Sequence, residues 1–273
     1  MNPTARRLSQ LTLLTLLVSL LYVGSVSATV GWLPVSPADL AMKDNPKQPG
    51  EDAMILYRES VVDTRTANTS GDSVEEYVRI KIFTQAGTER GHVVIQYDKD
   101  WENIPSVTGR TILPDGTIKD FHGKVLDTTI VKAGNYTASA KTFTLPDVQP
   151  GCIIEYKYYR QASPQYLHNE EWILSSNLYT REAHFTYYPY EGEGGLGVTP
   201  LYRTYLLPPS AKMKREMDGS YTLEVSDVPA VVDEPLMPPK VVIEPRVEFY
   251  YEGPEDPDPT WSKERYWNHF AKK

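Results

Sequence analysis

Hydrophobic and polar residues alternate along several short stretches of the chain, most clearly in residues 74–84. Val78, Ile80 and Ile82 occupy every second position there, and charged residues stand between them. Successive side chains of a β-strand point to opposite faces of its sheet. This period of two therefore predicts a strand with one face in the core.

A second alternating stretch follows the turn signal Pro150-Gly151. Cys152, Tyr156 and Tyr158 share one parity there, and a glutamate and a lysine fall on the other. Glycine after proline favours a tight turn, and the alternation behind it is typical of a half-buried strand. We expect residues 153–161 to form a strand that lies centrally in the sandwich.

The same periods and turn residues predict about a dozen short strands separated by glycine and proline turns. Many short strands at close spacing favour an all-β fold, a large antiparallel β-sandwich, over a parallel sheet with crossover helices. Strands 74–84 and 91–97 are expected to pair as a hairpin. The predicted strands are residues 54–62, 74–84, 91–97, 104–113, 118–121, 124–131, 141–145, 153–161, 170–175, 182–190, 201–207, 221–225 and 241–250.

The N-terminal residues match a secretory signal peptide. Residues 1–28 have a basic start, an apolar run and a small-residue exit that predicts cleavage after Ala28. The alternative is an uncleaved membrane anchor, but the apolar run contains hydroxyl residues and is shorter than the roughly 20 residues that span a bilayer. We expect an exported protein, periplasmic or extracellular, with no membrane contact beyond this segment.

The mature chain is expected to hold three further regions. Residues 29–52 are proline-rich and predict an extended lead-in, and residues 53–252 hold the β-sandwich. Residues 253–273 begin as an acidic, proline-rich linker and end in a short helix, for which Thr260 can provide the N-cap. Three aromatic residues of that helix share one side and need a surface to pack on.

The net charge argues against anionic partners, and the cysteine content rules out stabilisation by an internal disulfide. The chain has 28 basic and 36 acidic residues, a net charge of −8, and removal of residues 1–28 takes away two arginines and no acid. A surface this acidic repels nucleic acid and anionic lipid, so neither is an expected partner. One cysteine permits no internal disulfide, which suits a bacterial envelope protein better than a small eukaryotic secreted module.

The sequence offers little for catalysis. Cys152 is the only thiol, but it opens a strand on the face of two tyrosines, and we expect a small buried hydrophobe rather than a nucleophile. The five histidines are scattered without metal-ligand spacing. We therefore predict no catalytic residue, no cofactor and no metal site.

Tyrosine is the more informative residue, since 10 of the 19 tyrosines fall between Tyr156 and Tyr205. Tyr and Trp side chains on a sheet face can stack on sugars or anchor peptides, because they offer large area at low entropic cost. Core and cross-strand packing is the alternative, and it stays open. The candidate binding face, for a peptide or glycan ligand, comprises Tyr158, Tyr159, Tyr187, Tyr188 and Tyr190.

Several motifs occur in an order that resembles a known family. They are Phe83-Thr84-Gln85-Ala86-Gly87, residues 93–97, Ile112-Leu113-Pro114-Asp115-Gly116, residues 143–156 and Pro259-Thr260-Trp261. This order is similar to domain-of-unknown-function family 3857, over roughly residues 51–270. The resemblance implies an exported bacterial β-sandwich that precedes a transglutaminase-like, papain-type cysteine domain.

We expect an exported, non-catalytic β-sandwich domain that binds or scaffolds, with any chemistry in a transglutaminase-like partner domain. One alternative is a fragment of a transglutaminase-like or papain-type cysteine enzyme that lacks its catalytic domain, since the chain stops at Lys273 without a Cys-His-Asp domain. A second alternative is a carbohydrate-binding module, which would use the tyrosines for stacking.

Overall fold

The computed structural model describes residues 31–133, 136–164, 170–190, 199–232 and 234–252. The chain divides into two units, residues 1–36 and residues 37–273. Residues 31–36, the described part of the first unit, contain no helix or strand, and every element named below belongs to the second unit. The predicted signal peptide and C-terminal helix lie outside the described residues. No helix in the described ranges is long and apolar enough to cross a membrane.

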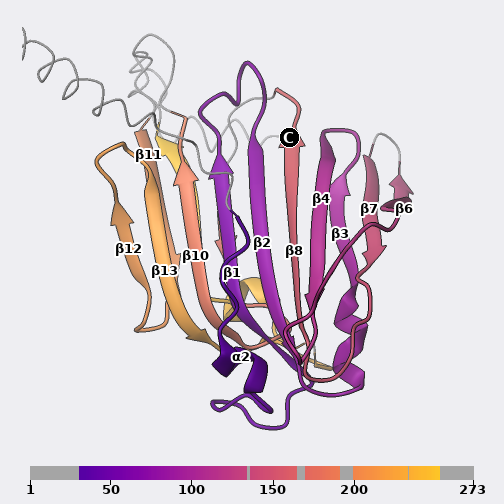
Figure 1. Cartoon of the computed structure of the whole chain (residues 1–273). Coiled ribbons are helices and arrows are strands. Elements are labelled where there is room, and N and C mark those ends of the chain that lie inside the picture. Colours follow the sequence, from indigo (N-terminus) through magenta and orange to yellow (C-terminus); the bar gives the residue numbers. More distant parts are fainter. Residues whose placement is uncertain (1–30, 134–135, 165–169, 191–198, 233, 253–273) are drawn as a thin grey trace, which may run out of the picture. The chain divides into compact units, whose positions relative to one another are not determined.

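The predicted all-β fold is confirmed, with fourteen strands described in three sheets. Eight strands form one large sheet in the order β12-β13-β10-β1-β2-β8-β4-β5, seen face-on in Figure 1. Its strands are β1 (Ala53–Asp63), β2 (Ser73–Ile82), β4 (Glu102–Ile112), β5 (Ile118–Asp120), β8 (Ile153–Ala162), β10 (Thr180–Tyr188), β12 (Lys212–Arg215) and β13 (Tyr221–Val228).

Two three-stranded sheets complete the described fold, in the orders β3-β7-β6 and β11-β14-β9. Their strands are β3 (His92–Asp98), β6 (Leu126–Ala133), β7 (Tyr136–Thr144), β9 (Glu171–Ile173), β11 (Thr199–Tyr205) and β14 (Arg246–Glu252). The helices are short: α2 (Pro37–Ala41), α3 (Lys240–Ile243) and the 3₁₀ turn η1 (Ala86–Gly91).

The predicted strand behind Pro150-Gly151 is β8, which lies inside the large sheet between β2 and β4. The turn forms as the sequence predicts: Gly151 takes a φ of 86°, and the Cys152 N–H donates to the Gln149 carbonyl at 3.1 Å. Glycine adopts this left-handed conformation without a steric cost, and so the chain enters β8 at a defined register.

Two expectations about strand pairing are wrong. The strands at residues 74–84 and 91–97 do not form a hairpin, because β2 pairs with β1 and β8 while β3 pairs with β7 in another sheet. The turn η1 carries the chain from the large sheet to the small one. The sandwich is also not wholly antiparallel, since β1 and β10 are parallel.

The described residues form two hydrophobic cores, one under each small sheet. The first joins residues of β1, β2 and β8 to residues of β3 and β7, and Ile80, Val93 and Phe143 are among its members. The second joins β10 and β13 to β9 and β14, and Phe185 and Phe249 belong to it.

Both cores lie on the same face of the large sheet, as strand β2 shows. Its even-numbered residues share one face, because side chains alternate along a strand. Val78 and Ile80 belong to the first core, and Val74 packs against the second. Glu76 lies between them on that face, at the boundary of the two cores.

Candidate functional site

A cavity of 610 Å³ opens on this face of the large sheet. Its floor is formed by β1, β2 and β8, one wall by η1 and the start of β3, and the other wall by residues 176–178, which follow β9. A volume in the range of about 300–1,000 Å³ is typical of sites for small ligands. The cavity therefore occupies the boundary between the two cores.

One part of the cavity is apolar. Ile55 and Ile80 face each other across β1 and β2, and Val93 and Leu178 line it from the two walls. All four side chains are buried, with most of their surface in the first core. This part can accept an apolar group without exposing any charge.

An ion pair lies on the cavity floor. The Arg58 Nε lies 3.5 Å from the Glu76 Oε2, and the Glu76 side chain is only 9% exposed. Arg58 Nη1 also donates to the Ile173 carbonyl at 3.2 Å, and its guanidinium lies 5.4 Å from the centre of the Phe185 ring. Burial lowers the pKa of Arg58, but Glu76, Tyr158 and Tyr156 together raise it, and the net effect is a raised pKa. The Arg58 guanidinium therefore remains charged at neutral pH.

Two tyrosines of β8, Tyr156 and Tyr158, also line the cavity. Within the described parts of the chain, neither hydroxyl makes a side-chain hydrogen bond. Burial raises the pKa of Tyr156 to about 12 and raises the pKa of Tyr158 further, with Glu76 adding to both effects. Each hydroxyl stays protonated at neutral pH, so it can donate one hydrogen bond and accept others.

A hydrogen bond links the two walls of the cavity. Arg90 at the end of η1 donates from Nη1 to the Asn177 Oδ1 at 3.1 Å. On the β3 wall, the His92 Nδ1 lies 3.2 Å from the Thr144 hydroxyl. These contacts fix the positions of the two cavity walls. A guanidinium carries five N–H groups, so Arg90 has further hydrogen-bond donors for a ligand in the cavity.

Comparison with known proteins places the chain in a family. Residues 69–232, more than half of the chain, match the model of a domain of unknown function with solved structure, DUF3857. This chain belongs to the DUF3857 family. All of the cavity's tyrosines, Glu76, Arg90 and both walls fall within the matched residues, whereas Arg58 precedes them.

One solved structure shows the fold of this DUF3857 chain in a larger protein. A candidate protease from Parabacteroides distasonis matches 72% of the chain with a TM-score of 0.57 and 15% identity, and the match covers 40% of that protein. An M1 zinc metallopeptidase from Deinococcus radiodurans covers 81% of the chain and 46% of its own length at 10% identity, but its TM-score is 0.32. No curated protein matches the sequence. The DUF3857 chain thus spans less than half the length of these proteins.

The structure does not bring the five predicted tyrosines of the DUF3857 chain onto one face. Tyr158 lines the cavity, whereas Tyr159 points to the opposite face of the large sheet because it is the next residue of β8. Tyr187 is 0% exposed and packs in the second core, 4.5 Å from the Phe249 ring centre. Packing thus explains Tyr187, and Tyr158 is the predicted residue that lies in the cavity.

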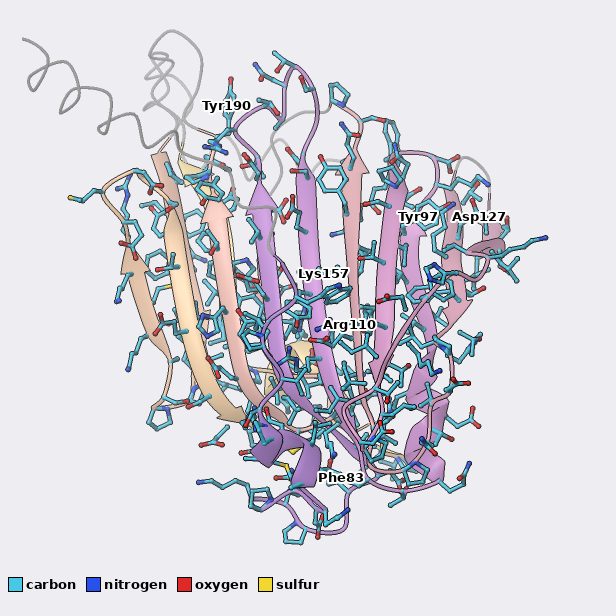
Figure 2. The ribbon with its side chains drawn as sticks, in the orientation of Figure 1. Phe83, Tyr97, Arg110, Asp127, Lys157 and Tyr190 are labelled. Atoms are coloured by element: carbon cyan, nitrogen blue, oxygen red, sulfur yellow. The ribbon has the colours of Figure 1, made fainter. Side chains whose placement is uncertain are left out.

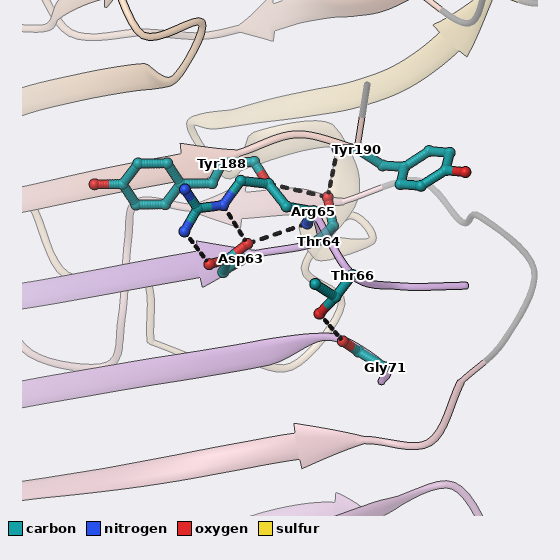
Figure 3. Close-up of polar contacts among 7 residues, drawn as sticks. All are labelled: Asp63, Thr64, Arg65, Thr66, Gly71, Tyr188 and Tyr190. Atoms are coloured by element: carbon teal, nitrogen blue, oxygen red, sulfur yellow. Dashed lines mark hydrogen bonds and ion pairs between the residues drawn. The ribbon is translucent and has the colours of Figure 1, made fainter. Parts of the chain in front are cut away.

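Tyr188 and Tyr190 lie near the end of β10, in the contacts drawn in Figure 3. The Arg65 guanidinium lies 4.4 Å from the centre of the Tyr188 ring, and Asp63 holds that guanidinium through two hydrogen bonds. The Tyr190 N–H donates to the Thr64 hydroxyl at 3.0 Å. These contacts fix the β1 and β10 ends to each other, and neither tyrosine lines the cavity.

Cys152 is buried as predicted, at 0% exposure in the first core. Burial raises the pKa of its thiol, so the protonated and poorly nucleophilic form predominates at neutral pH. In the described ranges, no group of three or more His, Cys, Asp or Glu residues is arranged to hold a metal ion.

A second cluster of charges lies on the other face of the large sheet and is separate from the cavity. Glu155 is 0% exposed and contacts Arg79 and Arg110, each through a nitrogen 2.6 Å from a carboxylate oxygen. The Tyr77 hydroxyl also donates to Glu155. Figure 2 shows Arg110 and Lys157 close together near the middle of the sheet.

Sequence reasoning does not find the ion pair of the cavity. Glu76 has a signal in the sequence, since it is a charged residue on the parity of Val74, Val78 and Ile80. Arg58 has no such signal, because a β-bulge between Ile55 and Tyr57 shifts the parity of β1 and turns Arg58 onto the cavity face.

Proposed function

We propose that this DUF3857 chain is an exported, non-catalytic binding domain whose ligand site is the cavity between the two small sheets. The observation that carries the proposal is the cavity itself, in which Tyr156 and Tyr158 lie beside the Arg58–Glu76 ion pair. Both tyrosines are partly exposed there, and each hydroxyl can donate one hydrogen bond and accept others. A ligand with matching donors and acceptors would form hydrogen bonds to these hydroxyls.

The composition of the cavity supports a ligand with both apolar and polar parts. Ile55, Ile80 and Leu178 would contact the apolar part, and the hydroxyls and the ion pair would contact the polar part. Arg58 and Glu76 already compensate each other, so the floor imposes no net charge on the ligand. Short peptides and glycans both meet this description.

A binding role is also consistent with the state of the thiol. Cys152 lies in the first core, away from the cavity lining, and its raised pKa disfavours the thiolate that a papain-type enzyme requires. In this proposal, catalysis belongs to a transglutaminase-like partner domain. The sequence pattern of residues 1–28 supports an exported location.

The second candidate is a non-catalytic part of a longer cysteine enzyme. The candidate protease with the same fold, of which the match covers 40%, supports a place for this fold in a longer enzyme. The two proposals agree on the role of the cavity and differ in the protein that provides the chemistry.

Removing one hydroxyl from the cavity tests the proposed function. The full chain is screened against arrays of short peptides and of bacterial glycans, and the tightest ligand is titrated by calorimetry. Tyr158→Phe is expected to weaken binding by about fivefold to tenfold, because one buried hydrogen bond contributes about 1 kcal/mol. Tyr159→Phe is the matched control, since it removes the same atom from the opposite face, and its affinity should equal that of the wild type.

Either of two results would contradict the proposal. One is the absence of any ligand on both arrays. The other is an equal loss of affinity in Tyr158→Phe and Tyr159→Phe, which would show that the ligand does not distinguish the cavity from the opposite face.

A further inference from the structure

Strand β3 presents an open edge at the cavity. Within the described residues β3 pairs with β7 alone, and its other edge has no strand beside it in the sheet order β3-β7-β6. His92, Val93 and Val94, at the start of β3, line the cavity. An unpaired strand edge is a template for another extended chain.

The hydrogen bonds to β7 decide which main-chain groups face this edge. The Leu145 N–H donates to the Gly91 carbonyl at 2.9 Å, and the Lys99 N–H donates to the Thr137 carbonyl at 3.0 Å. In an antiparallel pair the hydrogen-bonded residues alternate with residues whose N–H and C=O point the other way. The odd-numbered residues of β3 therefore bond to β7, and Val94 and Gln96 direct their main-chain groups to the open edge.

The main-chain N–H groups at the two ends of this edge already have hydrogen-bond acceptors. The His92 N–H donates to the Glu89 carbonyl, and the Asp98 N–H donates to the Glu102 carboxylate at 3.0 Å. Between them Val94 remains 48% exposed although it is an apolar residue. The open part of the edge is thus short, and Val94 at its start lines the cavity.

The cavity floor has the length of a short extended segment. It reaches along β2 from Ile80 to Glu76, and four residues of strand measure about 13 Å. An extended chain of about four residues fits beside this length. Its side chains would alternate between the floor and the opening, as in any strand.

We propose that the cavity binds an extended peptide segment, which adds to the open edge of β3 as a further strand. Its main chain bonds to the N–H and C=O of Val94 and Gln96. Its floor-facing side chains meet the apolar patch at Ile80 and the polar groups at Glu76. A peptide main chain is uncharged and carries donors and acceptors in equal number, which suits a floor whose ion pair is already compensated. This inference rests on the proposed function and names the ligand class of the same site.

A proline in the edge strand tests the inference. A displayed library of random octapeptides is panned against the full chain, and a selected peptide is synthesised and titrated. Val94→Pro removes an N–H that makes no bond to β7, and edge strands tolerate proline at such positions. It is expected to weaken binding by about tenfold or more while the melting temperature changes little. Tyr159→Phe changes a side chain on the opposite face of the large sheet and should bind as the wild type does.

N-methylation of the peptide gives a second measurement that does not depend on the folding of a variant. Methyl groups on alternate peptide nitrogens should abolish binding in one register and be tolerated in the other, because only one set of N–H groups faces β3. Equal tolerance in both registers would overturn strand addition.

The remaining outcomes separate this inference from the proposed function. A peptide that binds Tyr158→Phe more weakly but binds Val94→Pro with full affinity would refute strand addition and leave the cavity as the binding site. A library without binders, together with a glycan that binds the cavity, would refute the peptide class. The absence of both kinds of ligand would refute the proposed function itself.

Discussion

Replacement of Glu155 by alanine is expected to lower the free energy of unfolding by about 3–5 kcal/mol, because it leaves buried charges without their counter-ion. Glu155 contacts the guanidinium groups of Arg79 and Arg110 at 2.6 Å, and all three residues are buried. Taking a charge out of water costs several kcal/mol unless another charge compensates it. The carboxylate in β8 thus holds together three neighbouring strands of the large sheet, β2, β8 and β4.

Thermal unfolding followed by circular dichroism measures this effect. For a domain of this size the melting temperature should fall by about 6–20 °C. Glu182→Ala is the control on β10, because Glu182 is exposed and its contact is a surface pair with His184 at 2.7 Å. That change should cost no more than about 1 kcal/mol. Equal effects of the two substitutions would show that the buried cluster contributes no more than a surface pair.

Phe249→Ala is expected to cost about 3–5 kcal/mol through the cavity that it leaves in the second core. Phe249 is 0% exposed, and its ring centre lies 4.7 Å from that of Trp172 and 4.5 Å from that of Tyr187. Tyr221 lies 5.4 Å away. Removing a ring from among these aromatic neighbours leaves a large void, and rigid rings collapse into it poorly.

Urea unfolding of Phe249→Ala measures this loss, with Tyr250→Ala as the neighbouring control. Tyr250 follows Phe249 in β14 and points to the other face of its small sheet, where its ring meets Arg203 at 4.8 Å. Its removal should cost less than half as much. A loss below about 1 kcal/mol in Phe249→Ala would indicate that β14 does not contribute to the core as the packing implies.

The local pattern of hydrophobic and polar residues is sufficient to predict the strands. It does not predict which strands pair with each other. Alternation in residues 74–84 predicts β2 and the face of it that enters the first core, because side-chain direction depends on the strand alone. The opposite face is buried as well, at Tyr77, Arg79 and Lys81, which the alternation does not predict. The predicted hairpin with β3 is wrong, because the residues of η1 carry the chain into another sheet. The alternation of hydrophobic and polar residues contains no signal for that change of sheet. The parallel pairing of β1 with β10 joins segments far apart in sequence and has no local signal either.

The candidate site shows the same division. Tyr158 can be found because a tyrosine on the buried parity of a strand is recognisable from its neighbours. Tyr187 has the same pattern, but the small sheet that contains β9 and β14 packs over it. The sequence of β10 alone does not reveal that packing. Arg58 reaches the cavity through the bulge in β1, which changes the parity without a glycine or proline to mark it.

The most direct test of the central claim, that the cavity between the two small sheets is the ligand site, is a nuclear magnetic resonance titration of the isotope-labelled full chain with a selected ligand. We expect the largest shifts at the Arg58 Nε–H and at the main-chain amide of Val94, both of which belong to residues that line the cavity. Shifts concentrated at Lys157 and Tyr159, whose side chains point to the opposite face of the sheet, would contradict the claim.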